Sequence, residues 1–424
     1  MRVCLFEDAG VANLEPLTLT RPVFELLCGM DSLAVKQQRF FASEDLGVLI
    51  RASLVDFYRH EHPEIPVNDE SWLRAGPVIL VNGRWLPPKQ KVDMTVPCMA
   101  WFGDQLAYAS LPGEFAAQLS CDNLEESLES WKKRLPQQPA GGAFIIFPWD
   151  LVEQNGRQLS NDFEHLQETG PSSSQSDFAV VGPQDRLHIH PTASIDPMVV
   201  VDTTRGPVIV EQEAAVHAFS RLEGPCYVGP GTQVTGAKIR SGTSLGPQCR
   251  IGGEVEASII HGHSNKYHDG FLGHSYVGEW VNIGAGVQNS DLRNDYGEVS
   301  VRVSGQVLST GLTKVGCFIG DHTKIGLGAL INTGSNIGAF CNLLPSGGLL
   351  PRFIPSFCSW WQGSLKANDN WRQLLETAST MMGRRGCHFT EAHATLYSDL
   401  FDQTSLERQR TLQTTQQRAW RRTG

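Results

Sequence analysis

The sequence predicts an α/β domain at the N-terminus, followed by a parallel β-helix and then by helices at the C-terminal end. Three observations support this prediction. Short apolar runs alternate with amphipathic segments up to about residue 165, and from residue 189 onward aliphatic residues recur at a spacing of six. After about residue 361 the apolar spacing becomes that of a helix. A chain of 424 residues is also too long for a single ordinary core.

The N-terminal region contains three short apolar runs that we interpret as buried strands, at residues 3–6, 77–83 and 143–148. Between them, residues 123–134 place Leu124, Leu128 and Trp131 on one face, which predicts an exposed helix. Strands that alternate with helices favour a sheet with parallel strands.

The six-residue repeat is clearest over residues 319–338, where an aliphatic residue stands at every sixth position and Gly follows three of the four. This is the repeat of a parallel β-helix, in which the aliphatic side chain points inward and stacks on the next coil. A single repeat cannot bury its own apolar face, so such repeats are stable only as a stack. Further members of the series are Ile189, Ile195, Val201, Val210, Val216, Val228, Val234, Ile239, Leu245, Ile251, Val277 and Ile283.

Two segments break the phase of this series, residues 254–271 and 288–316. Insertions in a regular solenoid usually leave it as loops on a functional face, so we expect the site there. A polar segment rich in Ser is the best linker in the chain. The predicted divisions are an α/β domain at 1–166, a linker at 167–180, the β-helix at 181–360 and a helical extension at 361–424.

Composition excludes several function classes. The formal charge of −10 argues against a nucleic-acid or anionic-membrane surface, because phosphate backbones select basic proteins. The ten cysteines show no CxxC and no paired spacing, which predicts free thiols, no zinc module and a cytoplasmic protein. We expect neither a targeting segment nor a membrane span.

The segment from Gly262 to Gly286 holds the densest set of polar and aromatic residues. His268, Leu272-Gly273 and the run Val281-Asn282-Ile283-Gly284-Ala285-Gly286 resemble the acetyltransferase domain of GlmU. GlmU joins a Rossmann-like nucleotidyltransferase domain to a left-handed β-helix. The resemblance implies that His268 is the general base that deprotonates an amino-sugar amine for attack on acetyl-CoA, which suits a neutral imidazole.

The same resemblance implies further roles. Arg240 matches an arginine that binds the phosphate of the sugar substrate, and Asn282 matches an asparagine beside the sugar. Lys266 is a further candidate for the substrate site. Ala285, Asn294 and Tyr296 fall near the expected acetyl-CoA site.

Two departures change the expected acceptor. Glu256 stands where the family has a phosphate-binding lysine, and Phe271 stands where it has a sugar-contacting tyrosine. A carboxylate repels a phosphate, so the acceptor is expected to differ from that of GlmU.

The N-terminus is similar to the start of sugar-phosphate nucleotidyltransferases in the phrase Pro16-Leu17-Thr18, and Arg21 is a candidate for the nucleotide pocket. Three chemical parts are replaced. The run Phe6-Glu7-Asp8-Ala9-Gly10 stands in place of a glycine loop, Val23 stands where the family has a lysine, and Arg84 follows the strand end where a metal-binding aspartate is expected. Mg²⁺ is a candidate cofactor of this domain, whereas Glu7 and Asp8 are equally well explained as turn caps.

The whole pattern is similar to a divergent GlmU-like group described as sugar nucleotidyltransferases. It favours an acetyl-CoA-dependent N-acetyltransferase on an amino-sugar phosphate or sugar nucleotide, assembled as a homotrimer. Three alternatives remain: a nucleotidyltransferase whose β-helix only oligomerises it, a non-catalytic sugar-nucleotide scaffold, and a zinc enzyme of the γ-carbonic-anhydrase type. The last would use His263 and His268, but the nearest upstream histidine, His217, stands 46 residues before His263.

Overall fold

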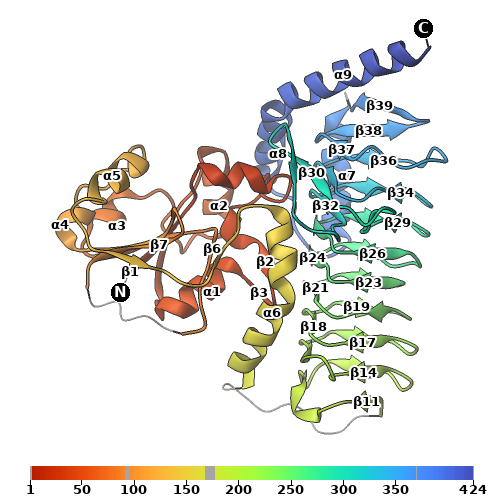
Figure 1. Cartoon of the computed structure of the whole chain (residues 1–424), viewed down its shortest axis with the longest axis horizontal. Helices are drawn as coiled ribbons and strands as arrows, with labels where there is room; N and C mark the ends of the chain where they lie inside the picture. Colours follow the sequence, from red (N-terminus) through yellow and green to blue (C-terminus); the bar gives the residue numbers. More distant parts are fainter. Residues whose placement is uncertain (1, 91–95, 168–176, 369, 424) are drawn as a thin grey trace. The chain divides into compact units, whose positions relative to one another are not determined.

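The computed structural model describes residues 2–90, 96–167, 177–368 and 370–423, with side chains up to residue 415. Its contacts divide the chain into two compact units. The first comprises residues 1–14, 20–26 and 31–147, and the second comprises 15–19, 27–30 and 148–424. Figure 1 labels their helices and strands.

The first unit is built on a six-stranded sheet with the order β4-β1-β5-β8-β7-β9. The pairs β1·β4 and β1·β5, on one side of the sheet, are parallel, as predicted, whereas β8 is antiparallel to both β5 and β7. The sheet is therefore mixed, because a short connection brings β8 back beside β7. The strands are β1 (Arg2–Phe6), β4 (Asp45–Leu49), β5 (Val78–Asn82), β7 (Cys98–Phe102), β8 (Gln105–Leu111) and β9 (Gln137–Pro139).

Among the described residues, five α-helices accompany this sheet, and the predicted helix is one of them, α5. They are α1 (Leu33–Phe41), α2 (Val55–Glu61), α3 (Glu70–Arg74), α4 (Gly113–Ala116) and α5 (Leu124–Trp131). The third predicted strand is shorter than expected: only β10 (Ala143–Phe144) forms, paired with β6 (Trp85–Leu86).

The second unit is a parallel β-helix with three faces, and one strand of each coil lies on each face (Figure 1). Face 1 contains β12 (Leu187–Ile189), β15 (Val208–Val210), β18 (Cys226–Val228), β21 (Thr243–Leu245), β24 (Ile259–Gly262), β27 (Tyr276–Glu279), β32 (Cys317–Ile319), β35 (Ser335–Ile337) and β37 (Phe353–Ile354). Face 2 contains β13 (Ser194–Ile195), β16 (Ala215–Val216), β19 (Gln233–Val234), β22 (Arg250–Ile251), β25 (Asn265–Lys266), β28 (Asn282–Ile283), β33 (Lys324–Ile325), β36 (Asn342–Leu343), β38 (Cys358–Trp361) and the antiparallel β39 (Ser364–Ala367). Face 3 contains β11 (Ala179–Val181), β14 (Val200–Asp202), β17 (Arg221–Glu223), β20 (Lys238–Ile239), β23 (Glu254–Glu256) and β26 (Phe271–Gly273), followed by the pair β29 (Gln288–Asn289) and β34 (Leu330–Ile331).

The predicted aliphatic series forms one continuous core through these coils. Val234, Ile251 and Ile325, for example, are at most 1% exposed. At the corner between faces 1 and 2 the backbone turns with positive φ at non-glycine residues, including His263, Trp280 and His322. Their rings continue as a stack into Phe340 and Phe357, with adjacent centroids 4.4–6.3 Å apart.

The predicted interruption at residues 254–271 is wrong, because β23, β24, β25 and β26 continue all three faces through it. Two features explain why the six-residue spacing of aliphatic residues is lost in this segment. Only 15 residues separate the register partners Ser244 and Ile259, and Lys266 occupies the inward position that is Ile251 one coil earlier. The second interruption is real: it carries the hairpin β30 (Ser300–Val303) and β31 (Gln306–Ser309).

In the part of the second unit that the structure describes, four α-helices accompany the β-helix. The long helix α6 (Pro148–Gln167) belongs to the second unit, so the predicted N-terminal domain at 1–166 includes a helix that packs elsewhere. Most of the predicted linker, residues 168–176, lies outside the described residues. The two predicted C-terminal helices form as α7 (Trp371–Gly383) and α8 (Glu391–Gln403), and the predicted frayed tail instead continues as α9 (Ser405–Thr423).

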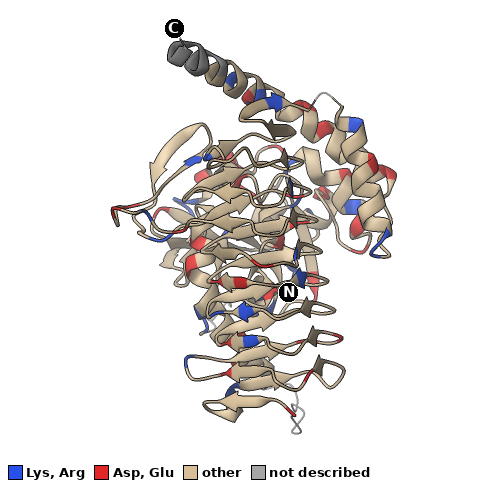
Figure 2. Cartoon of the chain, turned by 90° about the vertical axis from the view of Figure 1, so that its right-hand side faces the viewer, with Lys and Arg blue, Asp and Glu red and all other residues tan. Residues whose placement is uncertain are grey.

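None of the helices in the described ranges is long and apolar enough to cross a membrane. All ten cysteines are free, as the spacing predicted. Basic and acidic positions are interspersed over the coils of the β-helix (Figure 2).

Candidate functional site

The strongest chemical feature of the β-helix is a histidine held by a carboxylate. His274 follows β26, and its Nδ1 lies 2.7 Å from Oδ2 of Asp291 on the next coil. The two side chains are only 15% and 13% exposed. Burial acts to raise the pKa of Asp291, but the hydrogen bond and charge of His274, together with the charge of Lys314, hold it below its ordinary value. A histidine oriented in this way presents its other ring nitrogen for proton transfer.

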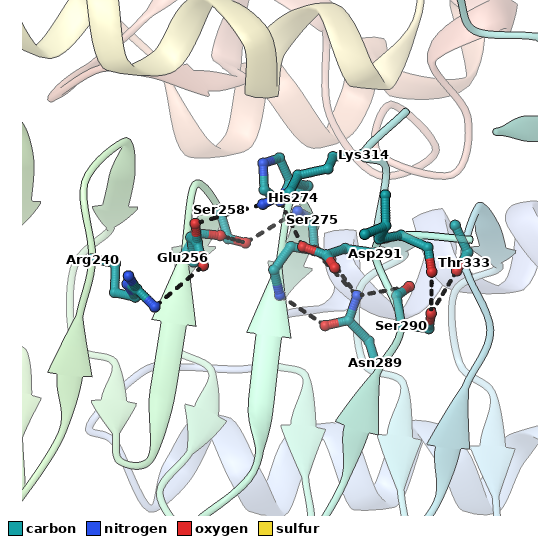
Figure 3. A network of polar contacts seen from close by, with 12 residues as sticks. Arg240, Glu256, Ser258, His274, Ser275, Asn289, Ser290, Asp291, Lys314 and Thr333 are labelled. Atoms are coloured by element: carbon teal, nitrogen blue, oxygen red, sulfur yellow. Dashed lines mark hydrogen bonds and ion pairs between the residues drawn. The ribbon is translucent and has the colours of Figure 1, made fainter. Parts of the chain in front are cut away.

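The backbone around this pair is held closely (Figure 3). The amide of Asn289, which is 4% exposed, accepts from the Gly273 N–H at 2.7 Å and donates to the Gly273 carbonyl at 3.1 Å. A Cβ on Gly273 would lie 2.6 Å from Asp291 Oδ2, so only glycine allows the carboxylate to approach. A Cβ on Gly316 would lie 1.9 Å from the Gly273 carbonyl oxygen. The pair therefore rests on a preformed frame.

The insertion after β29 completes this region. The chain leaves the coil at Asp291 and returns at Lys314, where Leu292 and Lys314 form an antiparallel bridge and Val315 donates to the Asp291 carbonyl at 2.8 Å. Lys314 Nζ lies 4.0 Å from Glu256 Oε1. The insertion thus places the Lys314 ammonium beside Glu256, which stands where the resemblance leads us to expect a lysine.

Arg240 is paired within the protein. Its guanidinium lies 3.0 Å from a Glu254 carboxylate oxygen and 3.8 Å from oxygens of Glu223 and Glu256. The hydrogen bond to Glu254 and the neighbouring carboxylates raise its pKa. An arginine shared by three carboxylates is poorly suited to bind a phosphate, so the geometry does not favour its predicted role.

His268 lies in the exposed turn between β25 and β26. Its ring meets the Tyr267 ring edge-on at 5.4 Å, and its carbonyl accepts a hydrogen bond from Lys266 Nζ at 3.1 Å. Within the described part of the chain, no carboxylate lies within ion-pair distance of its ring. His268 therefore lacks the orienting partner that His274 has.

The other predicted acceptor residues are distributed over two faces. Lys266 points into the core, where Nζ also donates to the Gly252 carbonyl at 2.8 Å. Asn282 lies on face 2 and accepts from Asn265 Nδ2 at 3.3 Å. Phe271 lies on face 3, in register with Glu254, and its ring approaches Gly273. Of these, only Phe271 borders the His274 region.

The residues predicted to bind acetyl-CoA lie in two turns. Ala285 is part of the turn between β28 and β29, and its carbonyl accepts from the Gly328 N–H at 2.8 Å. Asn294 and Tyr296 lie in the loop that follows Asp291, where Tyr296 is 73% exposed. An ion pair between Arg293 and Asp295 closes this loop.

A groove of about 900 Å³ opens beside the insertion hairpin. Arg302 from β30 and Arg352 contribute its positive charge, and the Arg302 guanidinium stacks 4.4 Å over the ring of Phe353. Trp360 and Thr411 also line it. The groove adjoins the His274 frame, because Gly334 lines it and donates to the Gly316 carbonyl at 2.8 Å.

In the first unit, a crevice of about 500 Å³ lies at the carboxyl ends of β1 and β4. Ligands of open α/β sheets bind at such edges. Here Asp8 is held by Arg84, with Oδ1 2.7 Å from Nε and Oδ2 2.5 Å from Nη2, and it also accepts from Asn82 at 2.7 Å. Glu7 accepts from Arg51 Nη1 at 2.5 Å and from the Val23 N–H at 2.9 Å.

These contacts test whether the crevice fits Mg²⁺. Both carboxylates already bind guanidinium groups, and a Cβ on Gly10 would lie 2.4 Å from the Arg84 guanidinium, which fills the space beside the loop. The carbonyl of Arg21 accepts from Arg51 Nη2 at 3.0 Å. No group of three or more His, Cys, Asp or Glu able to hold a metal occurs among the residues that were described. The residues present fit neither Mg²⁺ here nor the zinc site of the carbonic-anhydrase alternative.

Fold and site together define a class: an α/β domain joined to a hexapeptide β-helix whose most organised polar site is a histidine–carboxylate pair. Residues 3–170 match the family model described as sugar nucleotidyl transferase. A bifunctional sugar-1-phosphate nucleotidylyltransferase/acetyltransferase from Sulfurisphaera tokodaii is 37% identical over 149 residues, which cover 33% of this chain and 36% of that protein. The expected resemblance to GlmU-like proteins is thereby confirmed.

Two further relatives agree. The bifunctional protein GlmU of Azorhizobium caulinodans is 32% identical over 148 residues, covering 34% of this chain and 28% of that protein. An uncharacterized acetyltransferase, YaiX, from Escherichia coli O6:K15:H31 is 28% identical over 161 residues, covering 37% of this chain and 70% of the relative. The chain spans about a third of the length of the bifunctional relatives it matches.

Proposed function

We propose that this chain is an acyltransferase that moves an acetyl group from acetyl-CoA to the amine of an amino-sugar phosphate or sugar nucleotide. The observation that carries the proposal is the 2.7 Å contact between His274 and Asp291 beside the insertion. Similarity to an acetyltransferase and to bifunctional nucleotidyltransferase/acetyltransferases supports it.

In this mechanism Asp291 holds the Nδ1–H tautomer of His274, so that Nε2 accepts a proton from the acceptor amine. The amine nitrogen attacks the thioester carbonyl as that proton moves to His274, and the new C–N bond forms. The C–S bond then breaks, and the leaving sulfur of CoA takes the proton from His274 Nε2 to leave as the thiol. Proton transfer by a positioned base typically contributes about 10²–10⁴-fold to such a rate. His268, the base implied by resemblance, remains the competing assignment.

We further infer that the groove beside the hairpin takes the nucleotide end of the donor. Arg302 and Arg352 supply positive charge for its phosphates, and Trp360 supplies an aromatic face for its base. One lining residue of the groove, Gly334, is hydrogen-bonded to Gly316 of the His274 frame, which supports a donor site on this side of the β-helix. Ala285, Asn294 and Tyr296 remain candidates for contacts along the acyl arm.

The test is release of free thiol from acetyl-CoA with a panel of amino-sugar phosphates and UDP-amino sugars. His274→Gln is expected to lower the rate about 100-fold or more, and His268→Gln to change it little. Equal loss in both variants, or loss in His268→Gln alone, would overturn the assignment of the base. Absence of acetyl transfer with every acceptor would overturn the function. We expect a homotrimer in solution, which light scattering would measure.

The second candidate is nucleotidyl transfer by the first unit, with a β-helix that only oligomerises the chain. The match of residues 3–170 to a sugar nucleotidyl transferase model favours it. The engagement of Asp8 and Glu7 by Arg84 and Arg51 opposes a Mg²⁺-dependent reaction there. Release of pyrophosphate from a nucleoside triphosphate and a sugar 1-phosphate, measured with and without Mg²⁺, decides between the two. Binding of UDP-sugars with neither activity would leave the scaffold alternative.

A further inference from the structure

The segment between α7 and α8 places an arginine on the β-helix. Arg385 donates from Nη1 to the Gln248 carbonyl at 2.8 Å and from Nη2 to Asn265 Oδ1 at 2.7 Å. Gln248 stands at the corner between faces 1 and 2, and Asn265 lies on the outer side of face 2, next to the inward Lys266. The C-terminal extension therefore reaches back over coils more than 100 residues earlier in the sequence.

A second arginine lies at the same place. Arg250 is the register partner of Asn265 on the neighbouring strand, so their side chains leave the same side of the sheet. Its Nη1 donates to the carbonyls of Gly231 at 3.0 Å and Cys249 at 2.9 Å. Both arginines are half-buried and are held in position by main-chain carbonyls.

One acidic residue, Glu279, lies near these two guanidinium groups, because its charge acts together with that of Arg385 on Cys249 and Cys387. In the described ranges, no carboxylate lies within 4 Å of either one, in contrast to Arg240 and Arg221 on face 3, which are paired with glutamates. Burial lowers the pKa of Arg250, and the charge of Arg385 lowers it further, so the two groups repel each other. Like charges held together in a half-buried place destabilise the fold unless an anion joins them.

The surrounding groups are hydrogen-bond formers suited to an anion. Asn265 contacts Asn282 on the following coil, and Tyr267 lies near Arg250 with its hydroxyl as a further hydrogen-bonding group. Each guanidinium has five N–H donors, and the carbonyl contacts use only some of them. Planar forks of this kind bind phosphate oxygens in pairs.

We propose that Arg250 and Arg385 form a phosphate-binding site that the C-terminal extension completes on face 2 of the β-helix. The ligand class is a phosphate group, borne by an amino-sugar phosphate acceptor, by CoA, or free as inorganic phosphate. A phosphate borne by the acceptor or by CoA rests on the proposed acetyl transfer, and Asn282, a predicted acceptor residue, adjoins the site on face 2. The existence of the site does not rest on that transfer.

The test uses the full chain with Arg250→Gln, Arg385→Gln and the control Arg384→Gln. Arg384 neighbours Arg385 in the same segment but is exposed and makes no ion pair among the described residues. Calorimetry with inorganic phosphate, a hexosamine phosphate, CoA and dephospho-CoA measures binding directly. We expect wild type and Arg384→Gln to bind the same phosphate ligand, and each of the other variants to bind it at least about ten-fold more weakly.

Melting temperature separates a binding role from a structural one. In phosphate-free buffer, Arg250→Gln is expected to melt at or above the wild-type temperature, because it removes a repulsion. Phosphate should raise the melting temperature of wild type and not of this variant. No phosphate effect on wild type, or equal effects on all variants, would overturn the site.

The ligand panel identifies the source. If Arg250→Gln and Arg385→Gln weaken binding of the hexosamine phosphate alone, the site belongs to the acceptor. If wild type distinguishes CoA from dephospho-CoA and these variants do not, the site belongs to the donor. If the variants weaken binding of inorganic phosphate alone, the ligand is the free ion. Phosphate binding without any acetyl transfer would support the site while refuting the function, so the two failures are distinguishable.

Discussion

Replacing Lys266 with Met is expected to stabilise the folded protein near neutral pH, although Lys266 makes two hydrogen bonds. Its side chain occupies the inward aliphatic position of face 2 and is 3% exposed. Burial lowers the pKa of its ammonium from 10.5 to about 8, against the opposing charges of Asp269 and Glu254. The folded state therefore holds this proton less tightly than the unfolded state does.

The magnitude follows from that difference. Lowering the pKa from 10.5 to about 8 corresponds to a cost of ~3 kcal/mol in the free energy of unfolding wherever both states are protonated. The bonds from Nζ to the carbonyls of Gly252 and His268 return about 1 kcal/mol each. Lys266→Met removes both effects, so a net gain of roughly 1 kcal/mol is expected at pH 7.

The pH dependence gives the sharper test. Below about pH 8 the cost is present in full, and between pH 8 and 10.5 the unfolded state binds more protons, so wild-type stability rises with pH. Above pH 10.5 the cost is gone, and methionine only loses hydrogen bonds. The advantage of the variant should therefore shrink and reverse as the pH rises.

Urea unfolding of the β-helix at pH 7 and at pH 10.5, followed by circular dichroism, measures this change. Lys238→Met is the matched control, because Lys238 is exposed on β20 and its replacement should have little effect at either pH. If Lys266→Met lowered stability equally at both values, a buried ammonium would not be the source of the cost.

Three further predictions concern the frame of the His274 pair and the Asp8–Arg84 ion pair of the first unit. Asp291→Asn should lower acetyl transfer about 100-fold with little change in acceptor KM, whereas Asp399→Asn, at an exposed position of α8, should not; equal rates in both would refute the pair. Gly316→Ala should destabilise the β-helix by roughly 1–3 kcal/mol, because its Cβ would lie 1.9 Å from a carbonyl oxygen, and Gly348→Ala, with open space around it, should be neutral in the same melting experiment. Arg84→Met should destabilise the first unit by about 3 kcal/mol by leaving Asp8 unpaired, and an unchanged urea midpoint would contradict this.

The repeat made the β-helix predictable, because an aliphatic residue at every sixth position fits neither the spacing of a helix nor the alternation of a single strand. The coil containing Lys266 escaped the pattern, since a lysine at the inward position and a 15-residue coil both depart from it. The N-terminal strands were also predictable from their apolar runs. The antiparallel return of β8 was not, because alternation of strands and helices does not determine strand direction.

The sequence predicted the region of the candidate site but not the two residues that form it. His274 and Asp291 are 17 residues apart, which is one coil of this β-helix, and Ile259 and Tyr276 show the same spacing. Adding one coil length to each histidine would have found the pair. Resemblance instead directed attention to His268, which matches a family motif but has no orienting carboxylate in the described structure. A motif match identifies a residue by its place in the chain, whereas the coil length shows which side chains on neighbouring coils lie side by side.

Lys266 connects these observations into one arrangement. Its ammonium lies inside the coil and bonds the carbonyls of Gly252 and His268, so it fixes the turn that separates face 2 from face 3. The proposed phosphate site lies on face 2 beside Asn265, and the His274 pair lies at the end of β26 on face 3. The turn that the buried lysine holds therefore lies between the two sites. Lys266→Met removes both the cost of burying the ammonium and the two bonds that hold the turn. We therefore expect this variant to be more stable than wild type and slower in acetyl transfer.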